Sequence, residues 1–275
     1  MFNASLIISF YNKIEWLKLL LAALERQTFK QFEVIIADDG SSSSVLDEIP
    51  KLQAKSLLNI QHLWQPDNGF RKTVMLNKAI LASRSPYIIF IDGDCIPHHR
   101  FIEDHLRLSK ENRVLAGRRV NMSEHISKEL SPEKIKNGIL EQSFFLSLLQ
   151  NSIAGKSKDV EKGIHLNSTA INILLGTYKK KILGCNFSIS KNDLLDLNGF
   201  DERYRHPGVG EDTEINYRIK NKGMQVFQPK FSLVQYHLWH ARLSRENEPE
   251  NLLLLDETLK KKYVATPYGI DKTNN

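Results

Sequence analysis

Two aspartates, Asp92 and Asp94, stand one glycine apart in the segment FIDGDCIPHH, directly behind the apolar run YIIFI. Carboxylates this close repel each other, and the pKa of each is raised unless a cation lies between them. The spacing therefore predicts either a divalent-metal site or a solvated turn, since Asp-Gly pairs are frequent in turns. The rest of the chain has to decide between these two interpretations.

A second acidic pair, Glu211 and Asp212, follows the segment GVG at the start of a predicted helix. A carboxylate there could serve as general base toward a substrate hydroxyl, although acidic residues are also common in the first turn of any helix. His237 and His240, in YHLWH, follow an apolar strand-like run. Imidazoles are common metal ligands. Together with carboxylates and phosphate oxygens they suit Mn²⁺ or Mg²⁺.

Two further segments, ADDGSS and DNGFRK, carry groups that suit a nucleotide. Asp39 offers a carboxylate to the N–H of a pyrimidine base, the alternative being that this segment caps the helix that follows. Arg71 and Lys72 can neutralise phosphate. The helix dipole disfavours cations at a helix start, which favours a functional interpretation of both. The chain has neither a Gly-x-Gly-x-x-Gly fingerprint after its first strand nor a Walker loop.

The elements that must position these residues alternate between strands and helices in the first third of the chain. The predicted strands cover residues 5–11, 32–38, 58–64 and 86–92. Helices are predicted near residues 13–26, 44–55 and 71–83. This alternation indicates βαβ units and a mostly parallel sheet. Ligands bind outside the carboxyl ends of such strands, where the acidic and basic segments fall, which favours a binding rim over a plain turn.

The second half of the chain has a different pattern. Residues 121–180 are rich in helix signals and basic residues, with no predicted strand. The segment 138–153 carries an apolar stripe, which indicates either a core helix or a membrane-surface anchor. The stripe consists of Leu140, Phe144, Phe145, Leu148 and Leu149. Strands are then expected at 182–190 and 231–240, with a helix ending near 222 and a charged, partly helical tail from 241.

Composition excludes several classes of protein. The 275 residues include 38 Lys and Arg against 32 Asp and Glu, a net charge of +6 that allows a polyanionic or membrane-surface partner but does not indicate nucleic acid. The two cysteines cannot build a disulfide framework. No apolar run reaches the roughly 18 residues that a spanning helix needs. We therefore expect a cytoplasmic protein, with peripheral contact to the inner membrane face through residues 121–181.

Read in order, the segments resemble a known family. SLIISFYNK, FEVIIADDGSS, DNGFRKTVMLNKAI and YIIFIDGDCIP look like the nucleotide-sugar domain of family 2 glycosyltransferases, which have the GT-A fold. LGCNFSISKNDLLDLNGFDERY, GVGEDTEINYRI and YHLWHARLSRENEP resemble the C-terminal half of β-galactosyltransferases and of bacterial chondroitin-polymerase-type enzymes. The matches span roughly residues 1–120 and 182–248. The resemblance implies an α/β fold of the GT-A type, with a mostly parallel central sheet and a helical insert.

The resemblance also implies roles for individual residues. Ser9, Phe10 and Tyr11 would line the base, and Asp39 would bind the uracil. Asp94 would be the direct metal ligand of the D-x-D motif, with Asp92 and either His237 or His240 as further ligands. Asp212 matches the catalytic base, with Glu211 beside it. The other expected substrate-binding residues are Gly69, Arg71, Lys72, Asp92, Gly93 and Asn186. The segment HPGVG replaces the family's usual tryptophan-glycine before the acidic pair.

These observations predict an inverting, metal-dependent glycosyltransferase that moves galactose, N-acetylgalactosamine or glucose from a UDP-sugar to a glycan acceptor. Bacterial surface polysaccharide or lipopolysaccharide synthesis is the expected setting, and an oligosaccharide or lipid-linked glycan the expected acceptor. The predicted units are a nucleotide-sugar half (1–120), a helical insert (121–181), an acceptor half (182–240) and a C-terminal tail (241–275). The alternatives are a sugar nucleotidyltransferase and a non-catalytic nucleotide-sugar-binding module.

Overall fold

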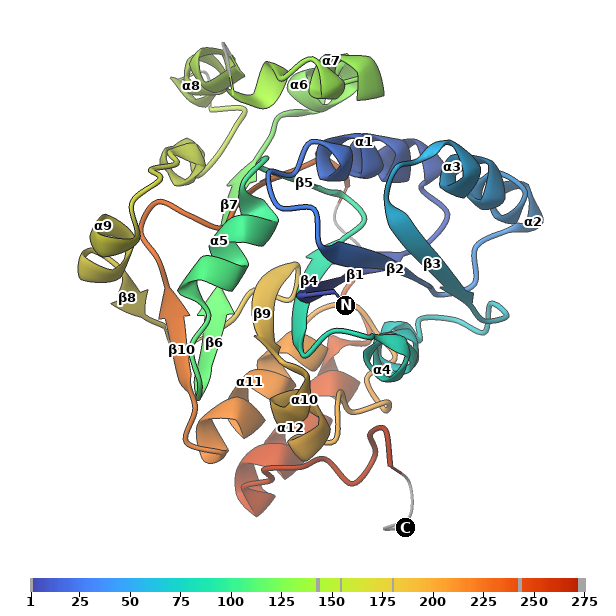
Figure 1. Cartoon of the computed structure of the whole chain (residues 1–275). Coiled ribbons are helices and arrows are strands. Elements are labelled where there is room, and N and C mark those ends of the chain that lie inside the picture. The colour runs from blue at the N-terminus through green and yellow to red at the C-terminus, as the bar shows by residue number, and fades with distance from the viewer. Residues whose placement is uncertain (1, 142–143, 154, 180, 242–243, 272–275) are drawn as a thin grey trace.

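The expected strand–helix alternation builds one half of a central sheet, as the computed structural model in Figure 1 shows. The structure describes residues 2–141, 144–153, 155–179, 181–241 and 244–271. Parallel pairing joins the first four strands in the order β3-β2-β1-β4. Their bounds are β1 (Ala4–Phe10), β2 (Phe32–Asp38), β3 (Asn59–Trp64) and β4 (Tyr87–Asp92). All four strand predictions are confirmed to within one residue at either end.

The helices between these strands are α1 (Ile14–Glu25), α2 (Ser43–Leu46), α3 (Ile49–Lys55) and α4 (Lys72–Ala82). The single helix predicted over 44–55 was wrong, because two short helices occupy that range. Pro50 is the second residue of α3. Proline has no backbone N–H to donate and fits only the first turn of a helix, so a new helix begins there.

The second half of the sheet is mixed. In the described ranges the sheet has eight strands and continues from β4 as β9-β6-β10-β8, with α5 (Phe101–Leu108) leading into β6. These strands are β6 (Arg113–Ala116), β8 (Thr177–Tyr178), β9 (Asn186–Ser190) and β10 (Gln225–Gln228). β9 runs antiparallel to both β4 and β6. The strand predicted over 182–190 is thus shorter than expected, and β8 corrects the expectation that 121–180 holds no strand.

A small second sheet brings distant parts of the chain to the D-x-D motif. β11 (Val234–His237) pairs antiparallel with β5 (Cys95–Pro97) and parallel with β7 (Arg118–Asn121). The three strands are short and come from distant parts of the chain, so no sequence periodicity within any one of them predicts the sheet.

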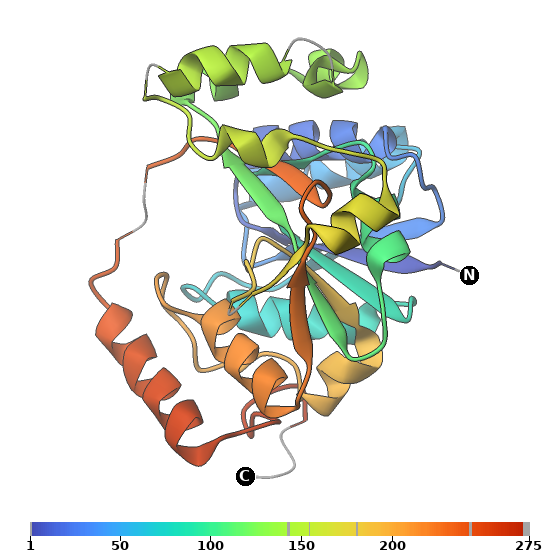
Figure 2. The same ribbon diagram turned by 90° about the vertical axis from the view of Figure 1, so that its left-hand side faces the viewer.

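Helices α6, α7 and α8 of the insert form a layer beyond α1 in both views, whereas α9 lies near β8 (Figures 1 and 2). The insert contains α6 (Glu124–Glu129), α7 (Pro132–Lys136), η1 (Ile139–Glu141), α8 (Phe144–Ile153), η2 (Val160–Gly163) and α9 (Thr169–Leu174). Leu140, Phe144 and Leu148 are buried in the same core as α1, whereas Leu149 is 44% exposed. The apolar stripe is therefore mostly core; the side chain of Phe145 lies outside the described part of the structure.

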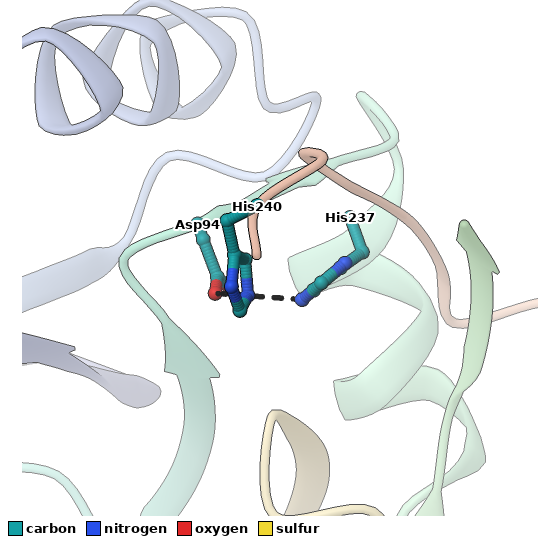
Figure 3. A group of neighbouring side chains, drawn as sticks. All are labelled: Asp94, His237 and His240. Carbon is teal, nitrogen blue, oxygen red and sulfur yellow. Dashed lines mark ion pairs between the residues drawn. The ribbon is translucent and has the colours of Figure 1, made fainter. Parts of the chain in front are cut away.

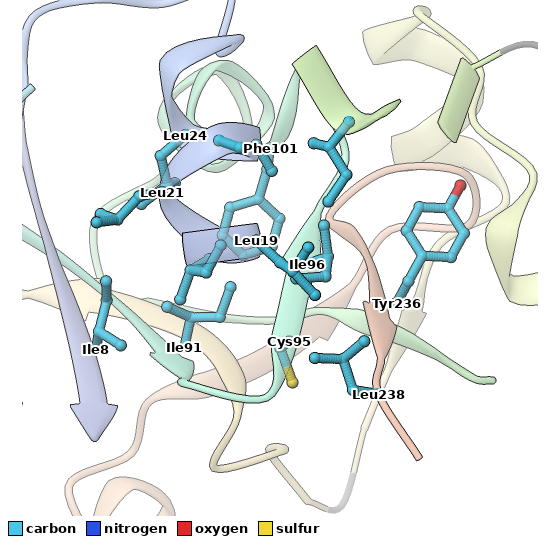
Figure 4. Close-up of a cluster of buried hydrophobic side chains, with 14 of the residues drawn as sticks. Ile8, Leu19, Leu21, Leu24, Ile91, Cys95, Ile96, Phe101, Tyr236 and Leu238 are labelled. Atoms are coloured by element: carbon cyan, nitrogen blue, oxygen red, sulfur yellow. The ribbon is translucent and has the colours of Figure 1, made fainter. Parts of the chain in front are cut away.

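The core beneath the site joins α1, the parallel strands and the small sheet (Figure 4). Leu24 of α1, Ile91 of β4 and Ile96 of β5 are fully buried. Removing such side chains from water stabilises a fold by about 1.5–3 kcal/mol each. This packing holds the ends of β1, β4 and β5, where the acidic motif lies, in one rigid frame.

The segment after residue 241 is an integral part of the fold. α12 (Glu248–Lys261) packs on α11 (Glu211–Asn221), near α10 (Lys191–Asp196). The chain then returns, and the backbone N–H of Ile270 donates to the carbonyl of Asn198 at 3.1 Å. Within the described ranges, no helix combines the length and apolar character needed to cross a bilayer.

Candidate active site

The register of the parallel strands sets the rim of the site. Ser9 at the end of β1 pairs with Asp92 at the end of β4, and the N–H of Gly93 donates to the Ser9 carbonyl at 2.9 Å. On the other side, Phe10 pairs with Asp38 of β2, and the N–H of Asp39 donates to the Phe10 carbonyl at 3.0 Å. The predicted base-binding and D-x-D residues therefore meet at one edge of the sheet.

A cavity of about 1170 Å³ opens at this edge. Most of the predicted residues line it: Ser9, Phe10, Tyr11, Asp39, Gly69, Lys72, Asp92, Gly93, Asp94 and His240. Its far wall belongs to the insert, through Glu124, Lys128 and Pro132 among others. The sequence pattern did not predict this wall or the exposed Trp239, which also lines the cavity. Nothing in the sequence pattern connects the insert to the rim, because only the tertiary packing of α6 and α7 places it there.

Asp39 is positioned as a fixed acceptor. Its carboxylate receives the Gln65 side-chain amide at 2.7 Å and the Arg71 backbone N–H at 2.6 Å. Burial raises the pKa of Asp39, while these two hydrogen bonds oppose the rise. Gln65 directly follows β3, and its place at the carboxyl end of a strand is the sequence signal for this contact. The guanidinium of Arg71 donates to the Pro66 carbonyl at 2.8 Å. It therefore lies beside the loop that follows β3 and does not point toward Asp92 and Asp94.

Asp94, His237 and His240, three of the residues predicted to bind a metal, lie together in one cluster (Figure 3). The β5–β11 register sets His237 opposite Cys95, next to Asp94. The Asp94 Oδ2 atom lies 3.4 Å from His237 Nε2 and 3.2 Å from His240 Nε2. One carboxylate and two imidazoles within 4.8 Å of one another are a donor set that fits a divalent transition metal. Both histidines, between which the sequence left the choice open, face Asp94.

Contacts within this cluster shift the pKa values of Asp94 and His240. Burial acts to raise the pKa of Asp94, but contacts with His237 and His240 outweigh it and hold the pKa far below its usual range. The pKa of His240 is raised, chiefly by its hydrogen bond to Asp94. A metal cation bound among these side chains would stabilise the charged form of Asp94 in the same way.

Asp92 is placed differently from the prediction. Its carboxylate is not a member of the cluster around Asp94 and instead accepts a hydrogen bond from Lys72 Nζ at 3.0 Å. The same Lys72 Nζ lies 3.1 Å from Glu211. Burial acts to lower the pKa of Lys72, but the charges of Asp92 and Glu211 raise it well above its ordinary value. Lys72 thus joins the D-x-D motif to the second acidic pair. These two ion pairs explain why a cation stands at the start of α4, where the helix dipole disfavours it.

Asp212 lies one residue beyond this bridge, beside the cavity lining. It accepts hydrogen bonds from the Gly184 N–H and the Thr213 hydroxyl, both at 3.2 Å. A Cβ atom on Gly184 would come within 3.0 Å of the Asp212 Cβ, so the close approach favours glycine. Burial raises the pKa of Asp212, the neighbouring Glu211 raises it further, and Lys72 opposes both. A carboxylate with a raised pKa is suited to accept a proton near neutral pH.

A buried ion pair supports α11 behind Asp212. Arg218 bonds both carboxylate oxygens of Glu214 at 2.7 Å, and both side chains are fully buried. The remaining Arg218 donors reach the carbonyls of Leu197 and Gly199. In the sequence, this ion pair was signalled by the spacing of four residues between Glu214 and Arg218. This network keeps the start of α11 in place against the sheet.

Asn186, a predicted substrate-binding residue, does not line the cavity. It is fully buried, and its amide donates to the carbonyls of Arg118 and Leu233. A Cβ on Gly117 would come within 1.9 Å of its side chain. Asn186 therefore joins the two sheets. The family resemblance implied a ligand contact, but the buried backbone carbonyls of Arg118 and Leu233 accept the hydrogen bonds of its side-chain amide.

This fold and site define a class of protein. The family model described as glycosyl transferase family 2 matches residues 5–167, more than half of the chain, so the chain belongs to this family. A second family model, the N-terminal domain of galactosyltransferase, matches residues 172–241. Both halves of the resemblance seen in the sequence are thereby confirmed.

Individual relatives agree. Chondroitin synthase of Escherichia coli is 30% identical over 274 residues, which cover 96% of this chain and 38% of that protein. Hyaluronan synthase of Pasteurella multocida is 26% identical over 254 residues, covering 90% of this chain and 25% of that protein. The chain thus spans less than half the length of these relatives.

Solved structures confirm the GT-A-type α/β fold. The crystal structure of S. aureus TarS superimposes with a TM-score of 0.58 at 19% identity, covering 94% of this chain and 39% of that chain. Residues 1–349 of TarS, solved in complex with UDP-GlcNAc, match with the same TM-score over 92% of this chain and 65% of that one.

Proposed function

We propose that this protein is an inverting glycosyltransferase that moves a sugar from a UDP-sugar to a hydroxyl group of a glycan acceptor. The observation that carries the proposal is the Lys72 bridge, with Asp92 at 3.0 Å and Glu211 at 3.1 Å. It unites the D-x-D motif, where a sugar diphosphate would lie, with the acidic pair that would act on the acceptor. A nucleotide-binding module alone has no need for that second pair.

Different residues of the rim would bind different parts of the UDP-sugar donor. Asp39 would accept the N–H of uracil, and Tyr11 and Phe10 would line the base. Asp94, His237 and His240 would hold Mn²⁺ or Mg²⁺, which stabilises the negative charge that develops on a leaving diphosphate. The imidazoles in this set favour Mn²⁺ over Mg²⁺, because Mg²⁺ prefers oxygen ligands.

Asp212 would deprotonate the acceptor hydroxyl as the oxygen attacks the anomeric carbon from the face opposite the diphosphate. An α-linked donor would thus give a β-linked product. The raised pKa of Asp212, caused first by burial and then by Glu211, supports the role of base. Lys72 would keep Glu211 and Asp92 paired, so that the charge of Asp212 faces the acceptor.

The sugar is proposed to be galactose, N-acetylgalactosamine or glucose, and the acceptor a bacterial surface polysaccharide or lipopolysaccharide. The galactosyltransferase-type model over residues 172–241 and the chondroitin and hyaluronan synthase relatives support this range. The TarS complex with UDP-GlcNAc supports UDP as the nucleotide.

The test is slow UDP release from a panel of UDP-sugars in Mn²⁺ without acceptor. Release from one donor, with no pyrophosphate formed from UTP and sugar phosphates, is the expected result. Pyrophosphate release would favour a sugar nucleotidyltransferase instead. Binding of UDP-sugars with no turnover on any glycan acceptor would favour a binding module.

We also propose peripheral membrane contact through the insert. Leu146 and Ile153 of α8 are 63% and 82% exposed, and Leu174 of α9 is 81% exposed. The insert and its edges are basic, with Lys156, Lys162 and other lysines nearby in sequence. Exposed apolar side chains in a segment rich in lysine suit an anionic lipid surface, where a lipid-linked acceptor would lie.

A further inference from the structure

A second group of metal-ligating side chains lies outside the site described above. His98 and His99 precede α5 in the α/β core, and Glu141 ends η1 in the insert. One nitrogen of each imidazole and one carboxylate oxygen all lie within 4.8 Å of one another. The three residues line a separate cavity of about 580 Å³, together with His165.

The surroundings orient Glu141 for a ligand. Arg26 is ion-paired with its Oε2 atom, which leaves Oε1 to face the histidines. Oε1 lies 3.1 Å from Nδ1 of His99. Both atoms are buried, and their contact is an ion pair whose angles fall outside good hydrogen-bond geometry. A metal ion bound to both atoms would satisfy them better than this contact does.

His98 is buried and lines the same cavity as His99 and Glu141. Its Nδ1 atom accepts only a long hydrogen bond, 3.3 Å from the backbone N–H of Arg100. A metal–nitrogen bond would outweigh that contact.

We propose that His98, His99 and Glu141 bind Zn²⁺, which fastens the helical insert to the α/β core. Two imidazoles and one carboxylate form a common Zn²⁺ ligand set, with water in the fourth position. The cavity leaves room for that water. Tetrahedral Zn²⁺ with bonds of about 2.0–2.1 Å keeps its ligand atoms roughly 3.3–3.4 Å apart. Side-chain shifts of about 1 Å would therefore complete the site. This site is independent of the proposed transferase activity.

The test is calorimetric titration of the full-length protein with Zn²⁺ after treatment with EDTA and its removal. Asp94→Asn weakens the first cluster, and His99→Asn or Glu141→Gln weakens the second. Wild type should bind two Zn²⁺ ions, Asp94→Asn should retain the second-cluster ion, and the Asp94→Asn/Glu141→Gln double variant should bind neither tightly. Each loss should weaken Zn²⁺ binding by at least about tenfold. His125→Asn is the matched control, since His125 is an exposed insert histidine.

A second readout tests the fastening itself. Zn²⁺ should slow amide hydrogen exchange in η1 of the Asp94→Asn protein, and Glu141→Gln should remove that effect, whereas His125→Asn should not. Glu141→Gln keeps the side-chain shape, so it remains informative if His99→Asn fails to fold. Unchanged Zn²⁺ binding in the double variant, or no Zn²⁺ binding by Asp94→Asn, would overturn the proposal. Neither result depends on transferase turnover.

Discussion

Replacing Asp212 with asparagine tests whether this residue is a base or a structural cap. Asparagine has nearly the same shape but cannot accept the acceptor's proton. General-base assistance contributes about 10²–10⁴-fold to a rate, or roughly 3–5 kcal/mol of barrier. We expect kcat to fall within that range, while UDP and Mn²⁺ affinities change less than about threefold, because Asp212 lies beside the nucleotide rim and not on it.

The structure also sets the expected effect on stability. Asp212 accepts two hydrogen bonds, and losing one costs about 0.5–1.5 kcal/mol. The folded-state pKa of Asp212 is raised by burial and by Glu211, so folding favours its protonated form. That contribution is present below the unfolded pKa and is lost as pH rises through the folded pKa. At neutral pH the substitution removes an unfavourable buried charge, so the two effects offset and Tm should change little.

The assay measures thermal stability, UDP affinity and kcat on one preparation of each variant. Asp193→Asn is the control, because Asp193 also lies in the first turn of a helix, accepts hydrogen bonds from the Ser190 hydroxyl and Lys222, and does not line the cavity. The control should lose stability and keep kcat. In wild type, activity should fall as pH drops, with a midpoint above the usual range of an aspartate. If Asp212→Asn keeps its kcat, Asp212 is not the base.

Three further outcomes are expected. Asp94→Ala should abolish turnover and Mn²⁺-dependent UDP binding together, and full wild-type turnover in excess EDTA would contradict the metal assignment. Lys72→Met should leave two facing carboxylates unpaired and cost on the order of 3 kcal/mol in urea unfolding; an unchanged midpoint would show that the bridge does not stabilise the fold. The protein should co-sediment with anionic vesicles at low salt, and Ile153→Glu should reduce this; equal binding to neutral vesicles would argue against the basic surface.

The strands and their carboxyl-end motifs were predictable because each depends on a local pattern. Continuous apolar runs define β1, β2 and β4, and polar residues follow them at once. The split of α2 from α3 was not predicted, although Pro50 is the physical reason for it. β8 has only two residues, too few for any periodicity, and it forms only because β10 offers it an edge.

For the active site, residue types and their order in the sequence were enough to identify the candidate acids, the two histidines and the cations. Charged and polar side chains at the ends of buried strands have few roles besides ligand binding. Tertiary structure decided which of them act together. The β5–β11 register brings both histidines to Asp94, the packing of α4 on the sheet turns Lys72 between Asp92 and Glu211, and burial draws Asn186 into the junction of the sheets. The first two of these outcomes depend on contacts between segments more than 100 residues apart, and no local sequence pattern predicts such contacts.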